Sequence, residues 1–463
     1  MALSQRNAQR LGGGAHDTLQ HVDSVYFLPF PDWEKELRSN RWHYATRWAR
    51  LKPVIMLNPV LAGGSARSVG ISGMPNLRVL RIRSLTQRKL LAARQIQLGQ
   101  VLLDIAEHGF SAPLLWAYNP DLSHVFAAVP AVARVYHATE AFFDMPRVAP
   151  RFVRRLSAMI GISDVTVAVS DGVADGVRRH VQGAEVVTVT NGCDYRHYSD
   201  RKPDAELTSR GHAFERVAVY AGNVNDRLDF GLLNRLADEH HEVLFAAYGP
   251  VGPLTDGDAR QWHAFVRHPN VTATGAVDPD RLRDIYAAAD IGLIPYRQDP
   301  WLVENGLPLK ALEMAATGLP VVSSLMNSLR GFAKALVVTS TSDEFLSAFE
   351  RTGRSRLTAA ESQELFAVSS ANDYDVKFGQ ALAAIESHVD SSRAITRVDR
   401  LIELLGPDWI DDELRFARWL GMSAHNRMLE WSLSSAARFV PASVKRRIIP
   451  DRLRAATQEL RGS

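Results

Sequence analysis

The stretch that decides the fold is VTATGAVDPDRLRDIYAAADIGLIPY, residues 271–296. It begins with a short run rich in Val and Thr, continues with a helical pattern over 278–290, and ends in the apolar run IGLIPY at 291–296. Two strand patterns separated by one helix are typical of a β–α–β unit. The stretch therefore predicts a parallel sheet that is covered by helices on both faces.

The same alternation continues in both directions and falls into two groups. Strand patterns of the first group occupy 24–30, 53–60, 112–118, 133–139, 165–170 and 185–190, and those of the second occupy 216–222, 242–249, 271–277, 291–296, 319–324 and 335–340. We therefore expect an α/β protein with two consecutive doubly wound domains. Ligands in such sheets bind at the carboxyl ends of the strands, so the cleft between the domains is the expected active site.

The segment between the two groups, residues 191–215, is polar and rich in turn residues, and we interpret it as an interdomain linker. The predicted organisation is a disordered N-terminus over 1–20, Rossmann-like domains over 21–200 and 213–370, a closing helix over 371–390, and a helical basic tail over 391–463.

Bulk composition is that of an ordinary globular protein, with 46% hydrophobic residues, 23% charged residues and a net charge of +3. The single cysteine, Cys193, excludes an internal disulfide framework and fits a reducing cytoplasm. No apolar run approaches the roughly 18 residues of a membrane-spanning helix, and the first residues lack the apolar core of a signal peptide. We expect a cytoplasmic protein.

Positive charge is concentrated in the tail. Residues 438–463 hold seven Lys and Arg against two acidic residues, and no nucleic-acid-binding motif accompanies them, so no nucleic-acid partner is expected. Trp, Leu, Ile and Phe are mixed with these cations over 416–454, as in a helix that lies on an anionic membrane surface. The alternatives are a helical cap on the domains and a contact between copies of the chain.

The segment ENGLPLKALEMAATGLPVV, residues 304–322, predicts a helix with two unexpected charges. Pro308 suits the first helical position and Gly318 the position just past the end. Lys310 then lies in the first turn, where the helix dipole disfavours a cation. A phosphate bound at the helix start would reverse that penalty, and Glu313 on the same face could accept hydrogen bonds from ribose hydroxyls. The alternative is an exposed Lys310–Glu313 pair worth about 0.3 kcal/mol.

Four pieces of sequence occur together and in order: VTNGCD at 189–194, VYAGNVNDRLDF at 219–230, HPNVTATGAVDPDRLRDIYAAADIGLIPY at 268–296, and P-x-K-x-x-E followed by GLPVV within 304–322. With these pieces the chain resembles GT-B glycosyltransferases. The resemblance is to the bacterial branch that includes xanthan-type glucuronosyltransferases and group 1 (family 4-like) transferases. It covers about 21–390 and implies two Rossmann-like domains facing a cleft, with the acceptor on the first and the donor nucleotide on the second.

The resemblance also implies roles for residues of the second domain. Lys310 corresponds to the pyrophosphate contact and Glu313 to the ribose contact, at a helix that begins with Pro308 and Leu309. The remaining donor-binding candidates are Gly222 and Asn223, whose backbone would approach the diphosphate, Arg227 as a further cation, Tyr296 near the nucleotide, and 275–277 around a uracil. Gly222 could instead be a simple strand-to-helix turn, and Arg227 could form a surface pair with Asp229.

A metal ion is not expected, although Asp278-Pro279-Asp280 matches the D-x-D that holds a divalent cation in many glycosyltransferases of another fold. Asp280 is better explained as a capping or first-turn acid of the following helix. In GT-B enzymes helix ends and basic side chains usually stabilise the leaving diphosphate. No cofactor is expected either. The first strand is not followed by a G-x-G-x-x-G, which argues against a nicotinamide enzyme, and the sequence has no Walker A motif.

The acceptor side offers three catalytic candidates in ARVYHATEAFFDMP, residues 133–146. An inverting transfer needs a general base, usually a carboxylate or His. Glu140 stands where relatives commonly have Asp in a V-Y-D-x-x-D pattern, His137 replaces the first Asp of that pattern, and Asp144 is the alternative. A structural role, such as helix capping, remains open for each.

The sequence thus predicts a glycosyltransferase that moves a sugar from a nucleotide-diphosphate donor, expected to be a UDP-sugar, to a cell-surface polysaccharide or lipid-linked glycan without a metal. It would work in the cytoplasm, peripherally at the inner face of the plasma membrane if the tail binds there. Two alternatives remain: a GT-B-fold scaffold that binds a nucleotide sugar without transferring it, and a nucleotide-sugar epimerase.

Overall fold

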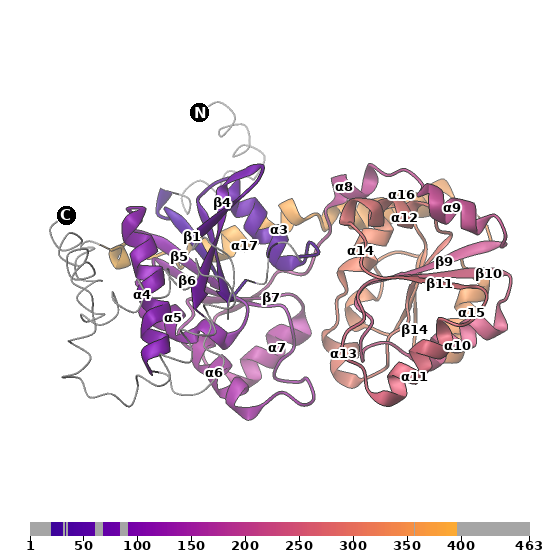
Figure 1. Cartoon of the computed structure of the whole chain (residues 1–463), viewed down its shortest axis with the longest axis horizontal. Helices are drawn as coiled ribbons and strands as arrows, with labels where there is room; N and C mark the ends of the chain where they lie inside the picture. The colour runs from indigo at the N-terminus through magenta and orange to yellow at the C-terminus, as the bar shows by residue number, and fades with distance from the viewer. Residues whose placement is uncertain are drawn as a thin grey trace, which may run out of the picture.

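The chain folds into two lobes, each a twisted, largely parallel sheet between layers of helices (Figure 1). This computed structural model describes residues 20–30, 33, 36–60, 68–83, 91–355 and 357–395. The predicted tail helix over 416–454 and nearly all of the predicted disordered N-terminus lie outside the described residues. Among the described residues, none of the helices combines the length and apolarity needed to cross a bilayer.

The first lobe contains an eight-stranded sheet in the order β3-β4-β2-β1-β5-β6-β7-β8. Its strands are β1 (Ser24–Leu28), β2 (Val54–Val60), β3 (Ser68–Ile71), β4 (Met74–Arg83), β5 (Pro113–Ala117), β6 (Ala133–Ala138), β7 (Val165–Ala168) and β8 (Val186–Thr188). Neighbours pair in parallel except β3 with β4. Each of the six predicted strand patterns contains a strand. The β3–β4 hairpin was not predicted, although MPNLRVLRIR alternates polar with apolar residues as a half-buried strand does. Its pattern differs from the continuous apolar runs of strands that are buried on both faces.

The second lobe contains a six-stranded, fully parallel sheet in the order β11-β10-β9-β12-β13-β14. Its strands are β9 (Arg216–Ala221), β10 (Val243–Tyr248), β11 (Val271–Thr274), β12 (Ile291–Ile294), β13 (Val321–Ser324) and β14 (Leu336–Thr339), one in each predicted pattern. The strand order reverses between β9 and β12. Ligands bind doubly wound sheets at such a switch point, so residues that directly follow these two strands are positioned for binding.

Helices cover both faces of each sheet (Figure 1). The helices of the first lobe are α3 (Asn40–Ala49), α4 (Leu91–Glu107), α5 (Ser123–Ala128), α6 (Pro150–Ile160) and α7 (Asp171–His180). Those of the second lobe are α8 (Tyr195–Ser199), α9 (Ala205–Gly211), α10 (Phe230–Glu239), α11 (Asp256–Phe265), α12 (Pro279–Ala287), α13 (Pro300–Asn305), α14 (Leu309–Ala316), α15 (Ser342–Arg351) and α16 (Ala359–Ala371). Short 3-10 turns occupy Pro120–Leu122, Asn327–Leu329 and Ser391–Arg393.

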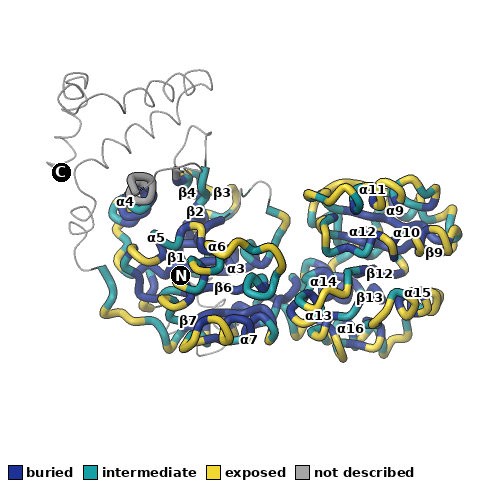
Figure 2. The backbone as a smooth tube through the Cα atoms, turned by 90° about the horizontal axis from the view of Figure 1, so that it is seen from below, coloured by how far each residue is buried: buried dark blue, intermediate teal, exposed yellow. Residues whose placement is uncertain are grey.

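Each sheet separates two apolar layers, as successive side chains of a strand point to opposite faces. In β1, Tyr26 and Leu28 join the core on one face, whereas Val25 and Phe27 join the core on the other. Figure 2 shows the buried residues gathered along the strands, with exposed residues on the outer helices.

The segment expected to be a linker, residues 191–215, differs in the structure. About half of it folds as α8 and α9, whose Tyr198 and Leu207 are buried in the core of the second lobe. The linker interpretation is therefore wrong for this part, because two short helices that each bury few apolar side chains keep a polar, loop-like composition. The passage between lobes is confined to the residues around Cys193, which forms an isolated parallel bridge with Asp373 on the returning chain.

The predicted closing helix corresponds to α17 (Tyr374–Glu386), which returns to the first lobe (Figure 1). Phe378 is 2% exposed and packs edge-on against Trp48 of α3, with ring centroids 5.4 Å apart. The ring of Tyr44 lies 6.1 Å away. The chain thus crosses between the lobes twice, and α17 fixes the second crossing to the first lobe.

Phe378→Ala should destabilise the first lobe strongly, because it removes an aromatic ring from a packed core. We expect the free energy of its unfolding transition to fall by about 3–5 kcal/mol in urea titrations. Val376→Ala on the same helix is the control, because Val376 is 43% exposed and its loss should change stability by less than about 0.5 kcal/mol. Equal effects of the two substitutions would contradict this account of α17.

Candidate active site

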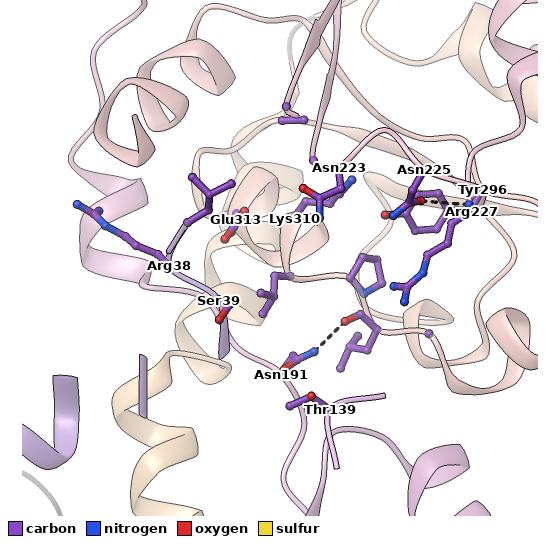
Figure 3. A pocket seen from close by; sticks show the side chains of 18 of the residues that line it. Arg38, Ser39, Thr139, Asn191, Asn223, Asn225, Arg227, Tyr296, Lys310 and Glu313 are labelled. Carbon is purple, nitrogen blue, oxygen red and sulfur yellow. Dashed lines mark hydrogen bonds between the residues drawn. The ribbon is translucent and has the colours of Figure 1, made fainter. Parts of the chain in front are cut away.

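A cavity of about 360 Å³ lies between the lobes and is lined by both. Its polar lining includes Arg38, Ser39, Thr139 and Asn191, which come before the second sheet, and Asn223, Asn225, Arg227, Tyr296, Lys310 and Glu313, which belong to the second lobe (Figure 3). The lining follows the carboxyl ends of β6, β9 and β12 and the start of α14. The cavity therefore occupies the place where the sequence predicts the active site.

Helix α14 starts one residue later than expected, with Pro308 as its extended N-cap residue rather than its first helical residue. Its end matches the expectation, since Gly318 follows the last turn with a φ of +74°. Pro308, Leu309 and Lys310 all line the cavity. The first amides of a helix lack intrahelical partners and give this end of the helix a partial positive charge. The N-terminus of α14 therefore presents positive charge to the cavity.

Lys310 is buried, with 9% of its surface exposed, and its Nζ has no hydrogen-bond partner among the described residues. The ammonium group lies 4.1 Å from the ring centroid of Tyr220 and 5.2 Å from that of Tyr296. Cation–π attraction offsets part of the lost hydration, yet the three N–H donors of an ammonium still require acceptors. The alternative of an exposed Lys310–Glu313 surface pair is therefore wrong.

Gly222, directly after β9, makes room for this ammonium group. Its φ of +141° is one that side chains rarely adopt, and a Cβ at this position would collide with Lys310 Nζ. Gly249, after β10, has a φ of +139°, and a Cβ there would collide with the carbonyl of Gly222. The two glycines let the ends of adjacent strands approach each other closely beside the cation. Gly222 is thus more than a simple strand-to-helix turn.

Glu313 also lines the cavity, half-buried one turn along α14 from Lys310. Burial raises the pKa of its carboxyl group to about 7, an effect that the neighbouring Tyr198 hydroxyl and the charge of Lys310 partly oppose. The ionised carboxylate is an acceptor for two hydroxyls, whereas the protonated form can also donate. Both forms are populated near neutral pH.

Arg227 reaches into the cavity from the loop after β9 (Figure 3). Its backbone N–H donates to Asn225 Oδ1, its guanidinium carbon lies 5.4 Å from the ring centroid of Trp301, and its Nη2 lies 2.8 Å from Glu140 Oε2. The alternative of a surface pair with Asp229 does not hold, because Asp229 caps α10 by accepting from the amide of Leu232.

The three catalytic candidates separate in space. Glu140 follows β6 and lines the cavity. His137 is fully buried within β6, outside the lining, where it accepts a hydrogen bond from Trp116 Nε1 and where burial lowers its pKa to about 3. Asp144 also lies outside the lining, and both of its carboxylate oxygens accept from Arg179 on α7. Of the three, the geometry favours Glu140 as the group that faces a substrate.

The two Asp residues of the D-x-D sequence have different roles. Asp278 is the N-cap of α12 and accepts from the amide of Asp280 at 2.8 Å, and Asp280 pairs with Arg38 of the first lobe at 2.9 Å. Within the described part of the chain, no group of three or more His, Cys, Asp or Glu side chains is arranged to hold a metal ion. Metal independence stays a prediction.

Several lining residues were not predicted. Asn191 donates to the carbonyl of Leu307, just before α14, and accepts from Asn40. The sequence feature that could have identified Asn191 is its position in an Asn-Gly pair after the last strand of the first lobe. Arg38, with a φ of +55°, and Trp301 lie on loops or short helices with no such signal. Ala276 and Val277 line the cavity as expected, although their contact with a uracil stays a prediction.

Glu313 should make stability depend on pH. Because its pKa rises from 4.5 to about 7 on folding, the contribution of its protonated form is complete below pH 4.5 and is lost as pH rises towards 7. Compared with Glu313→Gln, the wild type should lose roughly 1–3 kcal/mol of unfolding free energy across this window. Urea titrations between pH 4 and 8 measure the difference, and parallel curves for the two proteins would refute this assignment.

Comparison with known proteins agrees with this geometry. Residues 215–352 match the family model described as Glycosyl transferases group 1. A Bacillus subtilis protein named as a teichuronic acid biosynthesis glycosyltransferase, TuaH, is 32% identical over 155 residues, which are 33% of this chain and 38% of that protein. Alpha-galactosylglucosyldiacylglycerol synthase of Streptococcus pneumoniae is 30% identical over 110 residues, 23% of this chain and 28% of that protein. This chain thus covers less than two-fifths of either relative.

Solved structures share both lobes. Anabaena Alr3699/HepE, in complex with UDP and glucose, superposes with a TM-score of 0.59 at 12% identity, covering 79% of this chain and all of that one. Sucrose-phosphate synthase from Thermosynechococcus elongatus gives a TM-score of 0.56 at 14% identity, covering 79% and 96%. At such identities the likeness concerns the fold. The second lobe of this chain is a glycosyl transferases group 1 domain, and the two lobes together form a GT-B fold.

Proposed function

We propose that the protein is a glycosyltransferase that uses a nucleoside diphosphate sugar, a UDP-sugar, as donor. The observation that carries the proposal is the buried ammonium group of Lys310, which lacks a hydrogen-bond partner at the start of α14 and faces a cavity between two domains. A diphosphate supplies both the charge and the acceptor oxygens that this group needs. The same oxygens would accept from the first amides of the helix.

The expected positions of the ribose and the base of the donor nucleotide follow from this placement. With the diphosphate at Lys310, the ribose lies within reach of Glu313, one turn further along the same helix face, and the base lies towards 276–277. Lys310 and the helix start then stabilise the negative charge that develops on the leaving diphosphate. This supports a transfer that needs no metal ion.

The acceptor side of the proposal rests on Glu140. A carboxylate that faces the cavity from the first lobe can take the proton of an acceptor hydroxyl as the hydroxyl attacks the anomeric carbon. The names of the relatives, one for teichuronic acid and one for a glycosylated diacylglycerol, support a polysaccharide or lipid-linked glycan as acceptor. Peripheral association with the inner membrane face through the basic tail at 391–463 belongs to the same proposal.

Incubation with a panel of nucleotide sugars and a lipid-linked glycan fraction from a bacterial membrane tests the proposal. We expect UDP release matched by a glycosylated product, and we expect both to persist with a chelator present. Lys310→Met should lower the rate at least about 100-fold, because charge stabilisation of the leaving group is lost. Lys334→Met, which removes an exposed lysine of the same lobe, is the control.

The alternatives give different results in the same assay. A scaffold would bind a nucleotide sugar without releasing UDP, and an epimerase would release an epimerised nucleotide sugar without any acceptor. Strict dependence on added Mn²⁺ or Mg²⁺ would contradict the metal-independent mechanism.

A further inference from the structure

The ion pair between Glu140 and Arg227 joins the two lobes across the cavity. Glu140 belongs to the first lobe and Arg227 to the second, and their charged atoms lie 2.8 Å apart. The two side chains are 36% and 28% exposed, so the pair is only partly screened by solvent. The guanidinium donates a hydrogen bond to this carboxylate, and its carbon also lies over the ring of Trp301.

Arg227 and Lys310 are the two cations that the second lobe places in the cavity lining. Arg227 is on the loop that begins with Gly222, which itself abuts Lys310 Nζ. A diphosphate bound at Lys310 therefore lies beside the loop that carries Arg227. Its oxygens would attract the guanidinium more strongly than one carboxylate does, because they carry more charge and offer more acceptors.

We propose that Glu140 and the diphosphate of the donor compete for the guanidinium of Arg227. This rests on the proposed function and deepens it. Before the donor binds, Glu140 holds Arg227 and opposes binding by occupying the guanidinium that the diphosphate would contact. When the diphosphate takes Arg227, the carboxylate of Glu140 is released and faces the cavity as a free acceptor for a proton.

Competition for Arg227 would make donor binding precede removal of the acceptor proton. The base candidate is neutralised by its ion pair until a donor is present, so an acceptor hydroxyl meets an active carboxylate only after donor binding. Glu140 is thereby a restraint on donor affinity in addition to its proposed role with the acceptor.

Calorimetric titration with UDP tests the competition in a double-mutant cycle. Glu140→Gln, which keeps the shape of the side chain, should tighten UDP binding by roughly 3- to 5-fold, the upper part of the range that loss of a partly exposed ion pair allows. Arg227→Gln should weaken binding. In the Arg227→Gln background, adding Glu140→Gln should leave the UDP affinity unchanged within about twofold.

Two controls separate this mechanism from simpler ones. Asp280→Asn breaks a different ion pair between the lobes, Arg38–Asp280, without touching Arg227, so it should not tighten UDP binding. Uridine has no phosphate and should bind the wild type and Glu140→Gln equally. Both results are expected if the diphosphate itself displaces Glu140.

Three results would overturn the inference: no tightening in Glu140→Gln, the same tightening in the Arg227→Gln background, or equal tightening in Asp280→Asn. Tightening in the Arg227→Gln background would mean that Glu140 acts by general repulsion of the anion. Tightening in Asp280→Asn would mean that a looser contact between the lobes is sufficient. A wild type that binds UDP but shows any of these results leaves the proposed function standing, whereas a wild type that does not bind UDP removes both.

Discussion

The buried ammonium group of Lys310 is the constraint on which the rest of the site depends. A charged donor that is removed from water without an acceptor destabilises a protein by more than the roughly 1–3 kcal/mol of a neutral unpaired group. The surrounding structure is nevertheless built around it: Gly222 leaves space beside it, and the rings of Tyr220 and Tyr296 face it. Burial of this group is costly in the free protein and would become favourable if an anion bound to it, which is the basis of the proposed donor site.

The two doubly wound sheets explain why this cation faces another domain. Lys310 sits at the switch point of the second sheet, between the ends of β9 and β12, and those ends face the first lobe across the cavity. The bridge between Cys193 and Asp373 holds the two crossings together, while α17 anchors the returning chain. Ion pairs at Arg38 and Glu140 then connect the facing lobes. The fold thereby brings a carboxylate of one domain to the cations of the other.

Sequence periodicity was sufficient for the two parallel sheets, because strands buried on both faces are continuous apolar runs. Continuous apolar runs do not identify β4, whose alternate residues are polar, and periodicity does not identify α8 and α9, which bury too little to differ from a loop. These elements are defined by what packs against them, and that information is distant in the sequence.

The site was predictable to the same limited degree. The position of Lys310 in a first turn indicated an anion, but its burial depends on Gly222 and Tyr220, almost ninety residues earlier. His137, Glu140 and Asp144 could not be ranked by type alone. Their positions in the fold distinguish them as catalytic candidates: His137 lies inside β6, Glu140 lies just beyond the carboxyl end of β6, and Asp144 pairs with Arg179.

The most direct test of the central claim is a comparison of UDP with UMP in the wild type and in Lys310→Met. If the diphosphate is the missing partner of Lys310, the wild type should bind UDP at least about tenfold more tightly than UMP, as expected for a charge-assisted hydrogen bond. Lys310→Met should lose most of that preference, leaving what Arg227 and the first amides of α14 would supply, while the free protein becomes more stable to urea. A preference for UDP that survives Lys310→Met, in a variant no more stable than the wild type, would contradict the account.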